Sequence, residues 1–390
     1  MTVFAEAPQH EVKLEECCFY HTIDIPGYGT VDGFYDLRGH ESEYLGNVSF
    51  RGKRVLEVGP ASGSLSMFME REGAELVSIE MGPDQPPNFF WDLPAAAPPD
   101  LAATLARYSE TMERLRDGYW VCHAACSSRA KVCYGSASQI PQELGRFDIS
   151  VIASVLLHNR NPLQILEACA RITSETIVIV ELRGPGPATS PSMTFVPESN
   201  QRPWDTWWSF SPALLTRVLG TMGFPQSRVS FHQQNLGGRL VDFFTVVAGK
   251  LQRQESSQIQ PQAETGTPGI ALQCAADHLR MGVAETTCLE VKVRNTGRTS
   301  WLPFQPYPVL LSYHWREESG EVAIWDGIRS PLPWPIHPGD QVDLPLTVRA
   351  PEKPGVYTLE LTALQEQVHW FEDVAPNLPL RIRAAIEARA

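Results

Sequence analysis

The stretch VLEVGPASGSL, residues 55–65, constrains the fold of this chain more than any other. An apolar run typical of a buried strand leads into a turn bracketed by Gly59 and Gly63, and the residues that follow have helical spacing. A strand, a glycine turn and a helix in this order form a unit at which α/β proteins bind nucleotide-like ligands. The turn is not a dinucleotide fingerprint, because Ala61 stands at the second glycine position. It is not a P-loop either, because no Gly-Lys-Ser/Thr follows.

The sequence downstream predicts strands that alternate with helices. Further strands are expected at residues 74–81, 131–138, the start of 146–172, and 176–182. A helix at residues 211–224 and two short strands at 228–234 and 241–249 close the region. Such alternation predicts a parallel sheet in an α/β fold over residues 51–250, preceded by an N-terminal cap or lid segment at residues 1–50.

This region resembles the class I S-adenosylmethionine (SAM) methyltransferases. The pattern E-x-G-x-x-x-G, formed by Glu57, Gly59 and Gly63, is similar to their first motif. Glu80 ends the second strand, where an acid can accept both hydroxyls of an adenosine ribose; the alternative is a solvated strand-end acid. The closing strands resemble the methyltransferase sheet, whose last strand inserts antiparallel beside the fifth. The resemblance covers about residues 20–250 and implies a Rossmann-like sheet of seven strands, with SAM as cofactor.

The resemblance also implies which residues hold the cofactor. Many relatives carry an acid after the third strand to bind the adenine amino group, whereas this sequence has Ser136 with Ser138 nearby. We find no basic residue that is placed to pair with a carboxylated cofactor, so ordinary SAM is favoured. The predicted cofactor-binding residues are Glu57, Gly59, Pro60, Gly63, Glu80, Ser136, Ala137 and Ser154.

A catalytic base is expected near the end of the fourth strand. The acceptor attacks the donor methyl group in line, and a hydroxyl acceptor must also lose a proton. His158 in SVLLHNRNP falls at the start of the helix after that strand, and an imidazole titrates near neutral pH. We predict that His158 is the base; the alternative is a histidine that caps or packs the helix turn.

Two aromatic-rich segments are candidates for binding the acceptor. PESNQRPWDTWWSF, residues 197–210, holds three tryptophans that could stack on a sugar, an aromatic ring or a base, or could form a hydrophobic plug. At least one of them is expected to pack structurally. The segment before the first core strand is expected to lie over the cofactor as a lid. The predicted substrate-binding residues are Tyr20, His21, Arg38, Trp204, Trp207 and Trp208.

The long connection at residues 83–129 is expected to contain one helix and to influence acceptor choice. It includes CHAAC, which offers Cys122, His123 and Cys126. A zinc site would need a fourth ligand and better spacing, so no metal is predicted.

A second domain is expected after a polar linker at residues 251–268. Residues 269–390 contain short alternating strands separated by Asn-Thr-Gly, Pro-Gly-Asp and Pro-Gly turns, which predict an all-β immunoglobulin-like sandwich. Several of its stretches resemble small sandwich modules attached to some bacterial glycosyltransferases and glycan-handling enzymes. Its tryptophans could bind carbohydrate if exposed, although core filling is favoured: Trp301, Trp315, Trp325, Trp334 and Trp370.

The favoured function is SAM-dependent O-methylation of a sugar or other small hydroxylated metabolite, in natural-product or glycan biosynthesis.

The net charge of −13 makes nucleic acid an unlikely partner, and no apolar run predicts a membrane span. A cytoplasmic protein is expected, in which a homo-oligomer is an open possibility. Three stretches resemble one branch of the methyltransferases: YHTIDIPGYGTVDGFYDLRG, GKRVLEVGPASGSLSMFMEREGAELVSIE and FDISVIASVLLHNRNPLQILEA. This branch includes the tRNA wobble-uridine carboxymethyl-transferring enzymes and many natural-product or sugar methyltransferases. Two alternatives therefore remain: a tRNA-modifying methyl or carboxymethyl transferase, and a non-catalytic binding or scaffold protein.

Overall fold

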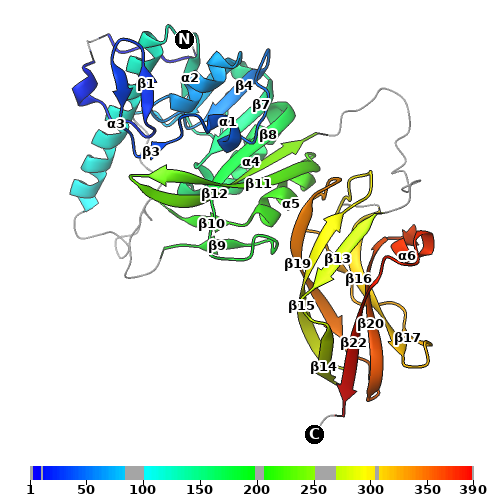
Figure 1. The fold of residues 1–390 in the computed structure, drawn as a ribbon. Coiled ribbons are helices and arrows are strands. Elements are labelled where there is room, and N and C mark those ends of the chain that lie inside the picture. The colour runs from blue at the N-terminus through cyan, green and yellow to red at the C-terminus, as the bar shows by residue number, and fades with distance from the viewer. Residues whose placement is uncertain are drawn as a thin grey trace. The chain divides into compact units, whose positions relative to one another are not determined.

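The computed structural model describes residues 3–9, 12–83, 101–197, 206–250, 269–303 and 307–388. The chain divides into two compact units, residues 1–252 and 253–390, and each is described by itself. Figure 1 labels the elements of both units. The predicted linker at residues 251–268 and the predicted substrate residue Trp204 lie outside the described residues.

An eight-stranded sheet forms the centre of the first unit, in the order β3-β11-β12-β8-β7-β4-β5-β6 (Figure 1). The strands β6, β5, β4, β7 and β8 are parallel, whereas β12 is antiparallel to both β8 and β11. The predicted α/β sheet, with its last strand antiparallel beside the fifth, is therefore confirmed. The strand bounds are β3 Tyr35–Asp36, β4 Arg54–Val58, β5 Glu75–Glu80, β6 Lys131–Tyr134, β7 Phe147–Ala153, β8 Thr173–Leu182, β11 Gln226–Leu236 and β12 Arg239–Gly249.

The sheet has one strand more than the seven predicted. β3 belongs to the N-terminal segment and pairs antiparallel with the outer edge of β11, where Tyr35 lies opposite Leu236. The short helix α1 (Glu41–Tyr44) follows, and Leu37 and Leu45 on either side of it are buried in the core. Residues 1–50, expected as a cap, thus supply a sheet edge and part of the core. Two paired residues are too few to produce a strand period in the sequence.

Helices cover both faces of the sheet. Leu56 of β4 and Ile179 of β8 lie in one core with α4 (Pro162–Ile172) and α5 (Pro212–Thr221). Their neighbours Val55 and Val180 lie in a second core with α1 and α2 (Ser64–Arg71). Successive residues of a strand point to opposite faces, so a strand that is covered on both sides must be apolar throughout. This explains the continuous apolar runs in the sequence.

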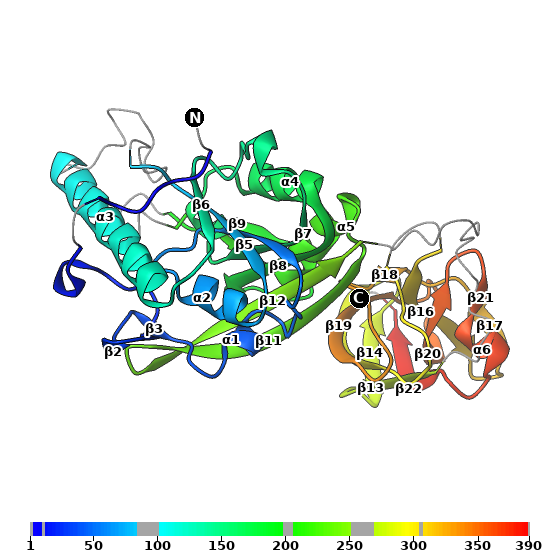
Figure 2. The ribbon, with the colours of Figure 1, turned by 90° about the horizontal axis from the view of Figure 1, so that it is seen from above.

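The long helix α3 (Leu101–Ala125) packs with the N-terminal segment into a smaller core beside β6. Figure 2 shows α3 next to this segment at the β6 end of the sheet. None of the described helices, α3 included, is long and apolar enough to span a membrane. The remaining elements of the unit are η1 Leu14–Glu16, β1 Ile23–Ile25, β2 Gly29–Val31, η2 Gln142–Leu144, η3 Leu156–His158, β9 Met193–Phe195 and β10 Trp208–Phe210.

The second unit consists of two sheets with a shared core. Alternate residues of each strand point inward, so that Val291 and Leu346 from one sheet meet Leu311 and Leu359 from the other. The first sheet contains β13 Ile270–Cys274, β15 Thr286–Asn295 and β19 Gln341–Arg349. The second contains β14 His278–Gly282, β16 Val309–Glu317, β17 Val322–Ile324, β18 Ser330–Pro331, β20 Gly355–Gln365, β21 His369–Trp370 and β22 Leu380–Glu387, with α6 Phe371–Val374 after β21. The all-β prediction is confirmed, while the immunoglobulin-like assignment stays a prediction.

Candidate active site

The turn after β4 lies at the edge of the sheet where the parallel strands end, the usual place for ligands in open α/β sheets. Gly59 and Gly63 have left-handed φ angles of 73° and 87°. A Cβ on Gly59 would lie 2.8 Å from the Val155 Cγ2 atom, so a side chain does not fit there. The Gly63 N–H donates to the Pro60 carbonyl at 2.8 Å, which closes the turn before α2 begins. The predicted glycine turn is therefore a tight backbone loop beside the end of β7.

Glu80 ends β5 with its side chain buried next to this turn. Its Oε1 accepts a hydrogen bond from the Met81 N–H at 2.7 Å, and its carboxylate also accepts one from the Ala61 N–H. Burial raises the pKa of Glu80, and these two bonds and the charge of Arg116 oppose that shift. An acid held by the backbone of the turn fits the recognition of two adjacent ribose hydroxyls. The residues present therefore fit the adenosine part of SAM.

Glu57 lies beneath the turn, and its carboxylate accepts hydrogen bonds from two serine side chains. Its Oε2 accepts hydrogen bonds from Ser66 Oγ at 2.6 Å and from Ser78 Oγ at 2.8 Å. Burial raises the pKa of Glu57 to about 7, and the two serine hydroxyls oppose the shift. Because these bonds join α2 to β5, Glu57 supports the turn from below. A direct contact of Glu57 with the cofactor stays a prediction.

The loop after β6 brings Ser136 and Ala137 beside the end of β5, because the Gly135 N–H donates to the Glu80 carbonyl at 2.8 Å. Ser136 Oγ lies 2.8 Å from Ser138 Oγ. The two serines that stand in place of the expected acid thus form a hydroxyl pair at the edge where the adenine is expected. Their role in binding it stays a prediction.

Ser154 follows β7 in a left-handed conformation with φ of 53°, and its Oγ lies 3.3 Å from Tyr44 OH. This brings a predicted cofactor residue together with the end of α1. Tyr44 is buried, which raises its pKa. The motif search did not single out Tyr44, because nothing near it in the sequence points to a site.

His158 lies in the short 3-10 helix η3 and not at the start of α4, where the sequence placed it; α4 begins only at Pro162. The side chain of His158 is half-buried. Trp207 holds this turn, since its N–H donates to the Leu157 carbonyl at 2.7 Å. The role of His158 as a base stays a prediction.

Glu181, near the end of β8, fixes the same turn from the core and was missed by the sequence reasoning. Its Oε1 accepts the Leu156 N–H at 3.0 Å, and its carboxylate also accepts the Leu157 N–H. Burial raises the pKa of Glu181 to about 8, and the two backbone bonds oppose the shift. The available signal was an acid closing the apolar strand TIVIVEL, where a buried carboxylate needs a partner.

A series of hydrogen bonds connects side chains of β11 and β12 to the backbone of α1. Thr245 Oγ1 donates to the Tyr44 carbonyl at 2.7 Å, so it accepts the hydrogen bond from His232 Nε2 at 2.8 Å. The other ring nitrogen, Nδ1, then accepts from the Gln234 side-chain amide at 2.9 Å. His232 is therefore the neutral Nε2–H tautomer, and burial lowers its pKa. No sequence pattern predicts this set of hydrogen bonds.

One of the predicted lid residues, Tyr20, reaches the turn, and His21 packs beside it. The Tyr20 N–H donates to Ser62 Oγ, inside the glycine turn, at 2.9 Å. The His21 ring centre lies 4.9 Å from that of Tyr20 and 6.5 Å from that of Tyr44. His21 is buried, which lowers its pKa to about 4, so its ring is neutral at physiological pH.

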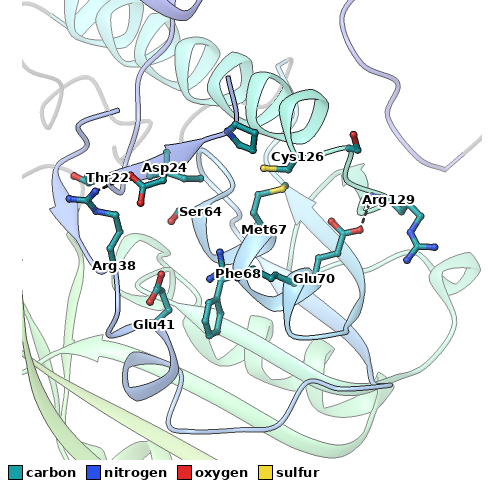
Figure 3. A pocket seen from close by; sticks show the side chains of 14 residues that line it. Thr22, Asp24, Arg38, Glu41, Ser64, Met67, Phe68, Glu70, Cys126 and Arg129 are labelled. Atoms are coloured by element: carbon teal, nitrogen blue, oxygen red, sulfur yellow. Dashed lines mark hydrogen bonds and ion pairs between the residues drawn. The ribbon is translucent and has the colours of Figure 1, made fainter. Parts of the chain in front are cut away.

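Arg38, the third predicted lid residue, forms ion pairs with Asp24 at 3.0 Å and with Asp36 at 2.9 Å. It lines a cavity of about 480 Å³ formed by α2, the β1 segment and the end of α3 (Figure 3). Among the predicted site residues that the structure describes, Arg38 alone belongs to this lining, and Gly59 and Glu80 lie outside it. We therefore place the candidate site at the edge of the sheet where the parallel strands end and not in this cavity.

The other sequence candidates make contacts within the protein, and the binding roles predicted for Trp207 and Trp208 stay predictions. Trp207 is only 3% exposed, in line with the expectation that at least one tryptophan packs structurally. Trp208 is half-buried against the core, and its Nε1 donates to the Arg160 carbonyl at 3.4 Å. In the CHAAC stretch, the His123 Nε2 atom lies 2.9 Å from the Ala130 carbonyl oxygen. Within the described part of the chain, no group of three or more His, Cys, Asp or Glu side chains could hold a metal ion.

The strand order decides the kind of fold. Five parallel strands, then β12 antiparallel beside β8 and β11 outside it, form the arrangement that the resemblance implied. The first unit has the class I methyltransferase fold. In this methyltransferase-fold unit, the glycine turn follows the central strand β4, and Glu80 ends the neighbouring strand β5.

Comparisons with known proteins found similarities in sequence and in structure. No family model matches the sequence. A ubiquinone biosynthesis O-methyltransferase from Cronobacter sakazakii (strain ATCC BAA-894) is 27% identical over 175 residues, 43% of this chain and 60% of that protein. The chain thus matches less than two thirds of that relative.

Solved methyltransferase structures are similar at lower identity. The N-terminal domain of EvdMO1, in the presence of SAH and D-fucose, is 19% identical with a TM-score of 0.39, covering 61% of this chain and 93% of that one. Magnesium protoporphyrin IX methyltransferase (ChlM) from Synechocystis PCC 6803, with bound SAH, is 11% identical with a TM-score of 0.35, covering 54% and 80%.

Proposed function

We propose that the protein is a SAM-dependent O-methyltransferase that acts on a sugar or another small hydroxylated metabolite. The observation that carries the proposal is Glu80, a buried acid at the end of β5 that accepts the Ala61 N–H of the glycine turn. The O-methyltransferase relative from Cronobacter sakazakii supports the same reaction type.

In this proposal, SAM supplies a methyl group on a sulfonium centre, and the protein mainly positions the two reactants. Glu80 binds the ribose, and the turn from Gly59 to Gly63 admits the cofactor close to the backbone. His158, held half-buried on η3, takes the proton from the acceptor hydroxyl. A small hydroxylated acceptor fits the acidic chain better than a nucleic acid, whose phosphates a net charge of −13 would repel.

The acceptor is expected on the side of Tyr44. Tyr44 OH and Ser154 Oγ lie together after β7, and the neutral ring of His21 lies beside Tyr44. Hydroxyl groups and a neutral imidazole recognise a hydroxylated ligand through hydrogen bonds without requiring it to be charged. These contacts support a sugar or a polyol as the acceptor class.

Isothermal titration with SAM and with its demethylated product tests the cofactor site. Glu80→Ala is expected to weaken binding about 10- to 100-fold, because hydrogen bonds to a charged group are worth about 1.5–3 kcal/mol. Glu75→Ala is the matched control, since Glu75 is an exposed acid at the opposite end of the same strand. Absence of heat with both ligands, or equal effects of the two substitutions, would refute the proposal.

Mass spectrometry of a native extract incubated with the protein and isotope-labelled SAM would then identify the acceptor. A labelled hydroxyl compound is the expected product. A label found only on tRNA, or on nitrogen or carbon, would contradict the proposed acceptor class while leaving the cofactor site intact.

A further inference from the structure

The tryptophans of the second unit differ in how far they are buried, and Trp334 is half-buried. Trp301 and Trp315 are fully buried in the core between the sheets. Trp325, in contrast, is 38% exposed, on the loop that joins β17 to β18. Trp370 of β21 lies partly exposed beside it, with ring centres 5.8 Å apart. Core filling therefore explains the first pair but not Trp325.

A buried polar network holds the inner face of Trp325. The His314 ring stacks on the indole with centres 4.0 Å apart and planes 16° from parallel, and its side chain has no exposed surface. His314 Nδ1 bonds to the Trp325 carbonyl, and Nε2 lies 2.5 Å from Glu372 Oε1. The second Glu372 oxygen accepts the Thr362 hydroxyl. The network thus fixes both the backbone and the ring of Trp325.

Glu372 is the acidic partner in this network. Burial alone would raise the pKa of Glu372, but the hydrogen bonds from His314 and Thr362 outweigh it, and the net shift is downward. Glu372 is therefore a carboxylate. Each ring nitrogen of His314 faces an oxygen atom, Nδ1 the Trp325 carbonyl and Nε2 the Glu372 carboxylate. The stacked ring and these two contacts together hold the indole in place.

The loop itself is fixed by a glycine. The Gly327 N–H donates to the Tyr313 carbonyl at 3.1 Å, and a Cβ on Gly327 would lie 2.4 Å from that same oxygen. Any other residue would lift the loop away from β16. The sequence Trp-Asp-Gly-Ile-Arg therefore presents Trp325 on a rigid base with its outer face toward solvent.

Charged groups lie around Trp370, the neighbour of Trp325. Arg329 lies 4.8 Å above the Trp370 ring and pairs with Asp326 at 3.0 Å and with Glu366 at 3.3 Å. The Asp326 side chain is 70% exposed. Oriented carboxylate and guanidinium groups next to an aromatic face can hydrogen-bond hydroxyls while a ring stacks on the indole.

We propose that Trp325, with Trp370, Asp326 and Arg329, forms a binding platform for a pyranose ring of a glycan. A buried polar network is rarely favourable for stability alone, and here it fixes an exposed aromatic side chain. The indole face carries negative charge density that attracts the C–H face of a sugar. This inference goes beyond the proposed function and does not depend on methyl transfer.

The test uses the full chain and a panel of immobilised oligosaccharides of glucose, galactose, mannose, rhamnose and N-acetylglucosamine, followed by titration of tryptophan fluorescence with any glycan retained. At least one glycan is expected to bind. Trp325→Ala should weaken it about 5- to 150-fold, the range that loss of one stacking partner costs. Trp325→Phe should retain part of the affinity, because a smaller aromatic face remains.

Val356→Ala is the matched control, because Val356 is 40% exposed at the far end of β20 from the Trp370 pairing. It should bind as the unchanged protein does. Asp326→Ala, at an exposed position, should weaken binding without loss of folding and carries the test if Trp325→Ala does not fold. Retention of no glycan, or equal binding by Trp325→Ala, Asp326→Ala and Val356→Ala, would overturn the proposal. If the protein showed no SAM binding in the calorimetric titration, the glycan proposal would still stand.

Discussion

Replacement of Glu181 should separate its two effects on stability, the hydrogen bonds that it accepts and the proton that it binds. Glu181→Ala removes the acceptor of two buried N–H groups, those of Leu156 and Leu157. Each unsatisfied buried donor costs about 1–3 kcal/mol, so unfolding should become easier by about 2–6 kcal/mol. Glu181→Gln keeps a carbonyl acceptor and should cost much less. Glu175→Gln, at an exposed position on the same strand, should change stability by less than about 1 kcal/mol.

The proton gives a second, pH-dependent signature. Burial raises the pKa of Glu181 from its ordinary value of 4.5 to about 8. The folded state therefore binds this proton more tightly than the unfolded state. The resulting stabilisation is fully present below the unfolded pKa and is lost as the pH rises through the folded pKa. At about 1.4 kcal/mol for each pKa unit, the loss between about pH 5 and about pH 9 is about 4 kcal/mol. A glutamine at position 181 does not titrate. The free energy of unfolding of Glu181→Gln, relative to that of the unchanged protein, should therefore rise by this amount over the same pH range.

Urea titration with pulse proteolysis of the full chain measures these differences. An N-terminal tag detected by immunoblot follows the first unit alone. Glu57, whose pKa burial also raises, contributes the same slope to every variant and cancels in the comparison. Identical pH profiles of Glu181→Gln and the unchanged protein, or equal costs of Glu181→Ala and Glu181→Gln, would refute the reasoning.

Two further outcomes are expected. His158→Ala and His158→Gln should retain SAM affinity while turnover falls about 10²- to 10⁴-fold, the usual contribution of a general base, and parallel losses of binding and turnover would instead mark His158 as structural. A chain of residues 1–250 should be soluble and bind SAM like the full chain in titration calorimetry, because each unit has its own core; aggregation or lost SAM binding would show that the second unit is a structural part of the first.

The parts of the site that the sequence predicted depend on local pattern. Strands buried on both faces appear as apolar runs, and the turn requires glycine where the backbone adopts positive φ. Glu80 could be placed because it directly ends such a run. The antiparallel last strand followed from the resemblance rather than from any local signal.

What the sequence did not predict depends on contacts between distant residues. Tyr44 is joined to Thr245 across 201 positions, and Glu181 caps a turn 25 positions earlier in the chain. No local period encodes such pairs. His158 was displaced from α4 because the left-handed residue Ser154 begins a separate turn, and only the fold reveals that conformation.

The pairing of β3 with β11 has a consequence for how the protein is made. Asp36 pairs with Asn235, which is synthesised about 200 residues later. This edge of the sheet can therefore form only after β11 has been made. At about 5–20 residues per second, translation leaves roughly 10–40 s between the two. During that interval Leu37, Tyr44 and Leu45, all buried in the finished protein, lack the strands that cover them. This segment is thus among the last parts of the first unit to fold, and its apolar side chains stay uncovered until β11 and β12 have been made.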